Sequence, residues 1–203
     1  MKTARILGGV RLNKYFCVID TETTWDNCIM SIGIVIADSC TFKPIDYRYY
    51  IITPEYRFGG MYSSRLLFNN QKASMIDSRD AVLNYAISLL TCYHTNSIFA
   101  YNASFDFRQL PELSKFTWYD IMRLAAYKQF NHAIPITADC CKTGKLKRGY
   151  GVEDIIRMLS GDNQYLETHN AIFDAFDELR IMSLLGHNID RYSIARLNNA
   201  ITK

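Results

Sequence analysis

The sequence predicts an α/β fold in which strands come first, helices follow, and both pack around one mixed sheet. Short apolar runs fill the first quarter of the chain, apolar residues recur at helical spacing further on, and turn-forming residues separate these segments. The chain has 203 residues, of which 49% are hydrophobic and 13% aromatic, so it can bury one substantial core. We therefore predict a single domain over residues 1–203.

Three strands are predicted near the N-terminus, at residues 15–19, 28–37 and 45–52. The first two are nearly continuous apolar runs, and the third alternates apolar and polar residues. Turn-forming residues at 24–27 and 38–44 separate the strands and leave no room for the crossover that parallel neighbours need. The three strands should therefore form an antiparallel meander.

A helix is predicted at residues 78–92, because apolar residues recur there at helical spacing and Asp77 or Ser78 can serve as the N-cap. The apolar run at residues 97–101 then predicts a fourth strand. A strand that follows a helix in this way can join the sheet that the meander begins.

The fourth strand leads into a second predicted helix, which begins at Phe105. Ser104 can cap this helix, and Pro111 must end or kink it. Residues 131–151 contain one proline, three glycines and several basic residues, so we predict an exposed loop. Its basic stretch, 142–148, either follows a phosphate backbone or is simply solvated. The remaining helices are predicted at 119–130, 152–159, 170–185 and 189–198.

Composition and charge narrow the classes of function. The formal net charge of +3 and the pI of about 8.5 are compatible with a nucleic-acid partner but do not identify one. The six cysteines include no C-x-x-C pair, which argues against structural zinc and a disulfide framework. The longest apolar run, 29–37, is far short of the ~18 residues that span a bilayer. Residues 6–10 are too short and glycine-rich for a signal-peptide core, so we expect a cytoplasmic protein.

Two acidic residues stand at the end of the first strand. Because side chains alternate along a strand, Asp20 and Glu22 share one face and Thr21 points to the other. Adjacent carboxylates repel each other, and a divalent cation between them removes that repulsion. The same pair could simply mark a strand end that turns into solvent. On its own, the pair leaves both interpretations open.

Three further polar residues lie at the starts of predicted helices. Asp106 and Asp174 each occupy a first turn, where the helix dipole favours a carboxylate. If Asn170 caps the last long helix, His169 stands outside it and can turn back toward Asp174. Taken singly, the aspartates are explained by the helix dipole and the histidine by surface exposure. Only in combination with the two strand acids do they indicate a functional site.

At these positions the chain resembles the DEDDh, or DnaQ-like, 3′-5′ exonucleases of the RNase H-like superfamily. Segments 16–24, 101–106 and 169–175 read FCVIDTETT, YNASFD and HNAIFDA, and they match the three family motifs in order. The resemblance includes WYDIM at 118–122 and covers roughly residues 14–186. The His-x4-Asp form of the third motif favours the DEDDh branch over its tyrosine-based relative. The implied fold is a central mixed five-stranded sheet with an antiparallel meander, flanked by helices.

The resemblance implies a metal-dependent exonuclease that uses two Mg²⁺ ions, for which Mn²⁺ could substitute, and that releases nucleoside 5′-monophosphates. His169 would be the general base, because an unperturbed imidazole pKa of ~6.5 leaves the ring neutral near pH 7 to 8. The implied partner is the 3′ end of single-stranded DNA or RNA. A homodimer or a larger nucleic-acid-processing complex is left open. The implied metal ligands are Asp20, Glu22, Asp106 and Asp174, and the implied substrate-binding residues are Thr23, Trp25, Asn102 and Phe105.

The chain also departs from the family pattern at positions that bear on substrate choice. Trp25 stands where many members have glycine, Tyr101 replaces a common histidine, and no His-Gly-Ile-Thr-like segment occurs between residues 53 and 77. Trp25 is either a stacking platform for the last base or a core residue. Two other functions remain: a catalytically silent nucleic-acid-binding module with the same fold, and an RNase H-like endonuclease. A covalently closed circular substrate would separate an endonuclease from an exonuclease.

Overall fold

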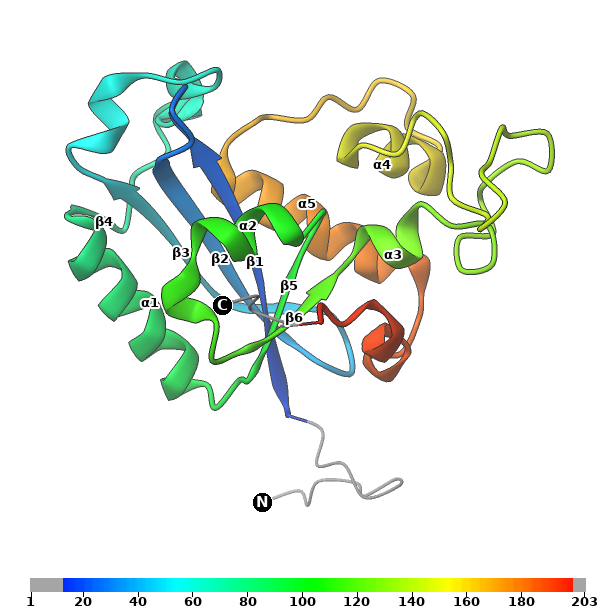
Figure 1. Cartoon of the computed structure of the whole chain (residues 1–203), viewed down its shortest axis with the longest axis horizontal. Helices are drawn as coiled ribbons and strands as arrows, with labels where there is room; N and C mark the ends of the chain where they lie inside the picture. The colour runs from blue at the N-terminus through cyan, green and yellow to red at the C-terminus, as the bar shows by residue number, and fades with distance from the viewer. Residues whose placement is uncertain (1–12, 199–203) are drawn as a thin grey trace.

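The computed structural model describes residues 13–198, which build one central sheet with helices on both faces (Figure 1). The strands lie in the order β4-β3-β2-β1-β5-β6. Their bounds are β1 (Tyr15–Thr23), β2 (Ile29–Asp38), β3 (Pro44–Ile52), β4 (Met75–Asp77), β5 (Ser97–Ala100) and β6 (Thr117–Asp120).

The strand pairing makes the sheet mixed, as the sequence predicts. Strands β1, β2 and β3 form the predicted antiparallel meander. Strand β5 then pairs with β1, β6 with β5, and β4 with β3, all in parallel. Within residues 13–198 the sheet therefore has six strands, and the expected count of five is wrong. Both outer strands are short, three residues in β4 and four in β6, and such short runs carry little periodicity.

Two apolar layers cover the sheet, because successive side chains of a strand face opposite sides. On β1, Phe16 packs in the layer that α3, α4 and α5 complete, and Cys17 packs in the layer that α1 and α2 complete (Figure 1). Asp20 and Glu22 are in phase with Phe16, so β1 directs both carboxylates toward α5. The helices are α1 (Arg79–Cys92), α2 (Ser104–Gln109), α3 (Met122–Ala125), α4 (Val152–Ser160) and α5 (Ala171–Leu185).

Helix α5 approaches the sheet closely at Gly33 on β2. A Cβ atom at this position would lie 2.0 Å from the Ala171 carbonyl oxygen, at the first residue of α5. Gly33 is also the register partner of Asp20 across the β1–β2 pair. The missing side chain therefore lets the start of α5 lie against the sheet beside the Asp20 carboxylate.

Two of the predicted helix caps are confirmed. The Ser78 Oγ accepts a hydrogen bond from the Ala81 backbone N–H at 3.4 Å and begins α1. The Asn170 Oδ1 accepts from the Ile172 N–H at 3.3 Å and begins α5. The cap predicted at Ser104 is wrong, because Ser104 is already the first residue of α2 and no side chain caps that helix.

Two of the predicted α-helices, at 119–130 and 189–198, are largely replaced by other structure. In the segment 119–130, the first residues belong to β6 and only the four residues of α3 are α-helical. Pairing of β6 with β5 outweighs the local helical pattern there, and the Asp120 carboxylate accepts from the Met122 N–H at 3.1 Å, where the chain turns. The segment 189–198 forms a 3₁₀ helix, Ile189–Ala195, instead of an α-helix.

The segment 131–151 is irregular, as predicted, but it is not wholly exposed. Asn131, Ile134 and Leu146 are buried and anchor it to the layer that contains α5. The amide of Asn131 donates to the Ala125 carbonyl at 2.7 Å. Residues between these anchors, including Ile136 at 96% exposure, do face solvent, so the segment is exposed only in parts.

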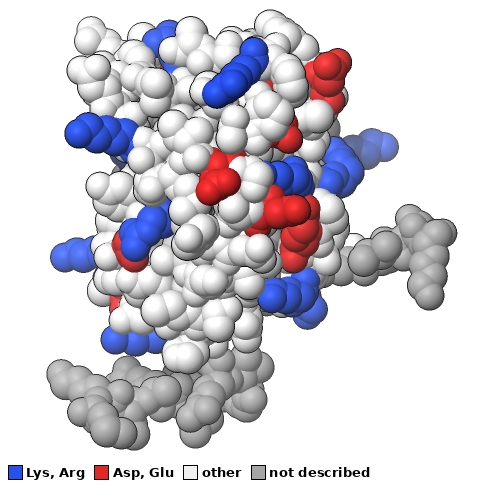
Figure 2. Space-filling view, turned by 90° about the vertical axis from the view of Figure 1, so that its left-hand side faces the viewer, with Lys and Arg blue, Asp and Glu red and all other residues white. Residues whose placement is uncertain are grey.

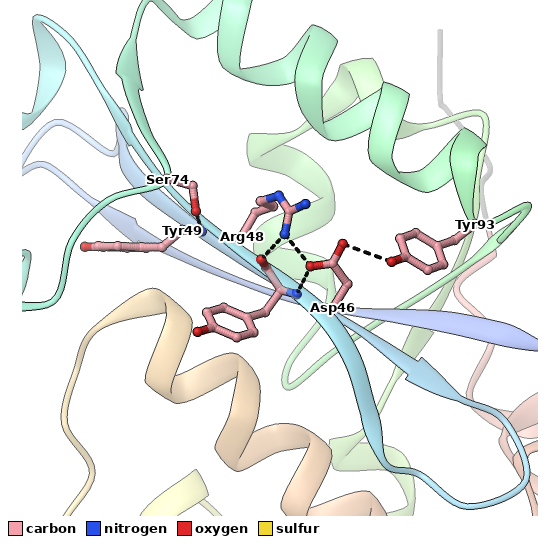
Figure 3. Close-up of polar contacts among 6 residues, drawn as sticks. Asp46, Arg48, Tyr49, Ser74 and Tyr93 are labelled. Carbon is pink, nitrogen blue, oxygen red and sulfur yellow. Dashed lines mark hydrogen bonds and ion pairs between the residues drawn. The ribbon is translucent and has the colours of Figure 1, made fainter.

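Polar contacts on β3 join the segments next to α1 and β4 to the sheet (Figure 3). The Asp46 carboxylate accepts from Tyr93, which follows α1, at 3.0 Å and also accepts from Arg48. Further along β3, the Tyr49 backbone N–H donates to the Ser74 Oγ at 3.1 Å, just before β4. These contacts tie the end of α1 and the start of β4 to the same strand.

Acidic and basic side chains are interspersed on the face that Figure 2 shows. The small net charge of +3 is therefore not gathered into one basic surface on this side. No helix within residues 13–198 has the length and apolar content needed to cross a bilayer. Residues 6–10, on which the expectation about a signal peptide rests, lie outside the described range.

Candidate functional site

Three of the predicted site residues meet where β1 ends and α5 begins. Glu22, His169 and Asp174 each offer a ligand atom, and these atoms all lie within 4.8 Å of one another. A β-bulge between Glu22 and Thr23 interrupts the β1–β2 register at this point. Such bulges redirect side chains and are frequent beside active sites. The site is thus assembled from residues far apart in the sequence.

Asn170 holds the start of α5 in place through both ends of its amide. While its oxygen caps α5, its Nδ2 donates to the Arg65 carbonyl at 2.7 Å and to the Tyr49 hydroxyl at 3.2 Å. Tyr49 in turn donates to the Leu66 carbonyl at 2.7 Å. The prediction that Asn170 caps α5 and leaves His169 outside the helix is therefore confirmed.

The imidazole of His169 stacks on the ring of Tyr62. The ring centroids are 4.0 Å apart and the planes differ by 11°. His169 has a φ of +56°, a left-handed conformation that few residues other than glycine adopt and that turns the ring back over the site. Burial lowers the pKa of His169, so the neutral ring is favoured. Sequence reasoning missed Tyr62, because no local pattern links it to the third motif.

Asp106 approaches the site from α2, on the opposite side of β1. Its Oδ1 accepts from the Thr21 hydroxyl at 2.7 Å, and both residues are buried. Thr21 does face away from Asp20 and Glu22, as predicted, and it is this orientation that lets Thr21 hold Asp106. The second motif thus reaches the end of β1 from the α2 face.

Asp20 is not one of the three residues that meet within 4.8 Å. Its carboxyl is nevertheless close to the other acids: burial, followed by the charges of Glu178 and Asp174, holds the pKa of Asp20 well above its usual range. The charges of Asp106 and Glu22 act in the same direction. Asp20 therefore lies among the four other carboxyls of the site.

The other predicted acids have raised pKa values as well. Burial, together with the charges of Glu167 and Glu22, raises the pKa of Asp174 to about 9. Burial and the charge of Glu167 raise the pKa of Glu22 to about 7. Burial also raises the pKa of Asp106 to about 7, although the hydrogen bond from Thr21 opposes it. Without a cation, the site favours protonated carboxyls.

Glu178 is a fifth acid of this site, and the sequence analysis did not identify it. It lies one helical turn after Asp174 on α5 and is only 1% exposed. Burial, followed by the charge of Asp106, raises its pKa well above the ordinary range, although a hydrogen bond from the Tyr101 backbone opposes this shift. A signal was present in the sequence, because residues four apart on a helix share a face. Asp174 and Glu178 have that spacing.

The raised pKa values predict how the stability of the metal-free protein depends on pH. A carboxyl whose pKa rises from 3.8 to about 9 on folding, as for Asp174, binds its proton more tightly in the folded state. Its contribution is complete below the unfolded pKa and is lost as pH rises through the folded pKa. We expect the Tm in EDTA to fall steadily between pH 5 and 9.

Thermal unfolding followed by circular dichroism would measure this slope. Mn²⁺ should raise the Tm most at the alkaline end, where the carboxyls are ionised. A Tm in EDTA that rises or stays level between pH 5 and 9 would mean that these carboxyls ionise normally.

The four predicted substrate-binding residues lie near Glu22 and Asp106 along the chain. Thr23 ends β1, just after the shift in the β1–β2 register. Trp25 is 67% exposed, so it is not a core residue, and its backbone N–H donates to the Gly59 carbonyl at 3.3 Å. Asn102 is exposed, with its backbone N–H held by the Asp120 carboxylate at 3.0 Å, and Phe105 is half-buried on α2. Thr23 and Phe105 thus belong to β1 and α2, while Trp25 and Asn102 lie in the turns just after β1 and just before α2.

The donor set fits a hard divalent cation. Carboxylate oxygens are the ligands that Mg²⁺ and Mn²⁺ prefer. Asp174 Oδ1 and Glu178 Oε2 are buried and have no hydrogen-bond partner among residues 13–198. The groups that most affect the pKa values of Asp20, Asp174 and Glu178 include no lysine or arginine. A bound cation would satisfy the unpaired oxygens and offset the repulsion.

No protein-family model and no curated protein matches the sequence. Solved structures do match the fold. A 3′-exonuclease in a study of histone mRNA stem-loop recognition matches with a TM-score of 0.62 and 17% identity. The alignment covers 87% of this chain and 65% of the exonuclease chain. The nuclease domain of 3′hExo, a DEDDh family member bound to rAMP, matches with a TM-score of 0.58 and 17% identity. The alignment covers 84% of this chain and 90% of that domain.

A third structure, Exonuclease X in complex with 5′-overhanging duplex DNA, has a TM-score of 0.57 and 19% identity. The alignment covers 89% of this chain and 98% of that one. At these identities the likeness is one of fold. The expected RNase H-like α/β fold, with its mixed sheet and flanking helices, is thereby confirmed.

Proposed function

We propose that the protein is a metal-dependent 3′-5′ exonuclease that hydrolyses single-stranded DNA or RNA and releases nucleoside 5′-monophosphates. The observation that carries the proposal is the meeting of Glu22, His169 and Asp174 within 4.8 Å, in a buried group of acids. A histidine beside carboxylates that lack a cationic partner suits hydrolysis of a phosphodiester better than binding alone.

Asp20, Glu22, Asp106 and Asp174 would hold two Mg²⁺ ions, for which Mn²⁺ could substitute. When bound, such ions supply positive charge that stabilises the transferring phosphoryl group and make water a stronger nucleophile. An imidazole nitrogen of His169 accepts the proton of the attacking water. The lowered pKa of His169 supports this role, because only the neutral ring can accept a proton.

The contacts that would select a chain end lie beside the acids. The backbone of Thr23, just after the shift in the β1–β2 register, would meet the terminal 3′ hydroxyl. The exposed Trp25 ring would stack on the last base, a contact worth about 1 to 3 kcal/mol that tolerates any sequence. Similar folds have been solved with a ribonucleotide and with duplex DNA, so we propose a nucleic-acid substrate without choosing between the two polymers.

A time course with 5′-labelled DNA and RNA oligonucleotides in Mn²⁺ tests the proposal. We expect a ladder that shortens from the 3′ end, no products in EDTA, and no cleavage of a covalently closed circle. Cleavage of the circle would indicate an endonuclease. Binding of either polymer without any cleavage, in both Mg²⁺ and Mn²⁺, would indicate a catalytically silent module.

The stack on Tyr62 should matter for the rate. Replacing Tyr62 with alanine removes a ring contact of about 0.5 to 1.5 kcal/mol that holds His169 over the site, so we expect kcat to fall about 2- to 10-fold. Tyr62→Phe keeps the ring and should keep the rate. Single-turnover kinetics with saturating Mn²⁺ would measure both, and equal rates for Tyr62→Ala and wild type would contradict a positioning role.

A further inference from the structure

We propose that Glu178 is an additional carboxylate of the metal centre, which helps to hold the divalent cations together with Asp20 and Asp174. The inference rests on the proposed metal-dependent function and extends it to a residue outside the three sequence motifs. It concerns how many negative charges the site presents to its ions.

The position of Glu178 on α5 supports this assignment. Four residues along a helix correspond to about 6 Å of rise and a rotation of about 40°, so Glu178 and Asp174 lie on the same face. That face packs against β1 and β2, where Asp20 is located. The acidic charges with the largest effect on Glu178 are those of Asp106 and Asp174, which approach from the two sides of the sheet.

Burial supports it as well. Glu178 is 1% exposed, and its Oε2 has no hydrogen-bond partner among the described residues. A buried carboxylate whose charge no cation offsets is strongly unfavourable, and the hydrogen bond from the Tyr101 backbone opposes the effect of burial on Glu178 only in part. The Glu178 charge is the largest acidic influence on the pKa of Asp20, and the main influences there include no lysine or arginine of the described residues. An unpaired carboxylate oxygen in such surroundings suits a metal ion.

The neighbouring acid on α5 provides a contrast. Asp177 is half-buried, and its carboxylate accepts a hydrogen bond from the Tyr165 hydroxyl. Asp177 therefore has a partner outside the site. Since Asp177 and Glu178 are adjacent on one helix and carry the same formal charge, Asp177→Asn is a matched control for Glu178→Gln.

Calorimetric titration of the metal-stripped full chain with MnCl₂ tests the inference, with no substrate present. We expect Glu178→Gln to weaken Mn²⁺ binding about 10- to 100-fold, the range measured for groups that support metal ligands. We expect Asp177→Asn to bind as wild type. The Tm in EDTA should also rise in Glu178→Gln, because a buried acid has been removed, and the Tm gain on adding Mn²⁺ should shrink.

Equal Mn²⁺ affinities for Glu178→Gln and wild type would overturn the inference and leave the proposed nuclease function intact. A wild-type protein that binds no Mn²⁺ at all would overturn the metal-dependent function itself. Glu178→Leu, which keeps the volume without any polar atom, gives a second measurement. It should lose Mn²⁺ affinity to at least the same extent, and retained affinity would again contradict the role of Glu178.

Discussion

Replacing Asp174 with asparagine should lower the rate of hydrolysis at least about 1,000-fold and at the same time raise the Tm of the metal-free protein. A metal ion contributes several kcal/mol to transition-state stabilisation, and about 4 kcal/mol corresponds to 1,000-fold in rate. Asp174 lies within 4.8 Å of both Glu22 and His169, and its Oδ1 has no protein partner in the described chain. An amide of the same shape cannot supply the negative charge that the ions need.

The gain in metal-free stability has a separate cause. With a pKa of about 9 in the folded protein, Asp174 must take up a proton on folding at pH 7, and asparagine removes that cost. Oligonucleotide cleavage and thermal unfolding in EDTA would be measured on the same preparations, with Asp177→Asn as the control on α5. A variant that unfolds at a lower temperature would mean that activity was lost through the fold, and full activity would exclude Asp174 from catalysis.

Replacing Gly33 with alanine should destabilise the fold by about 3 kcal/mol or more and abolish activity. The new Cβ would lie 2.0 Å from the Ala171 oxygen and 2.3 Å from the Ala171 carbon, and neither backbone atom can move without shifting α5. Because α5 carries Asp174 and follows His169, this shift would also separate both residues from Glu22. Urea denaturation and the cleavage assay would show the two losses together.

Gly151 provides the matched control for this substitution. A Cβ there meets nothing within 4 Å, and its φ of −69° is one that any residue adopts. Gly151→Ala should therefore leave both stability and activity near wild type. If Gly33→Ala were as stable as Gly151→Ala, the close approach of α5 to the sheet would not be required for folding.

The sequence predicts those features of the site that are set by residues close together in the chain. The alternation of β1 correctly predicts that Asp20 and Glu22 share a face with Thr21 opposite, and the cap at Asn170 correctly leaves His169 outside α5. The roles of these residues, and of Thr23, Trp25, Asn102 and Phe105 in binding substrate, stay predictions. Two of the errors arise at β6 and in the segment 189–198, where the local helical pattern competes with pairing and packing partners elsewhere in the chain.

The sequence by itself determined the antiparallel meander and the caps of α1 and α5, because periodicity and capping depend on residues within one or two turns. The list of acids and the histidine rests on the resemblance of three motifs to a family and stays a prediction. Only the tertiary structure decided that Tyr62 stacks on His169, that Gly33 admits α5, and that Glu178 joins the acids. These contacts link segments far apart in the chain, and they form only when the sheet and α5 pack together. The spacing along α5 places Asp174 and Glu178 on one face, but no local pattern shows which residues pack against that face.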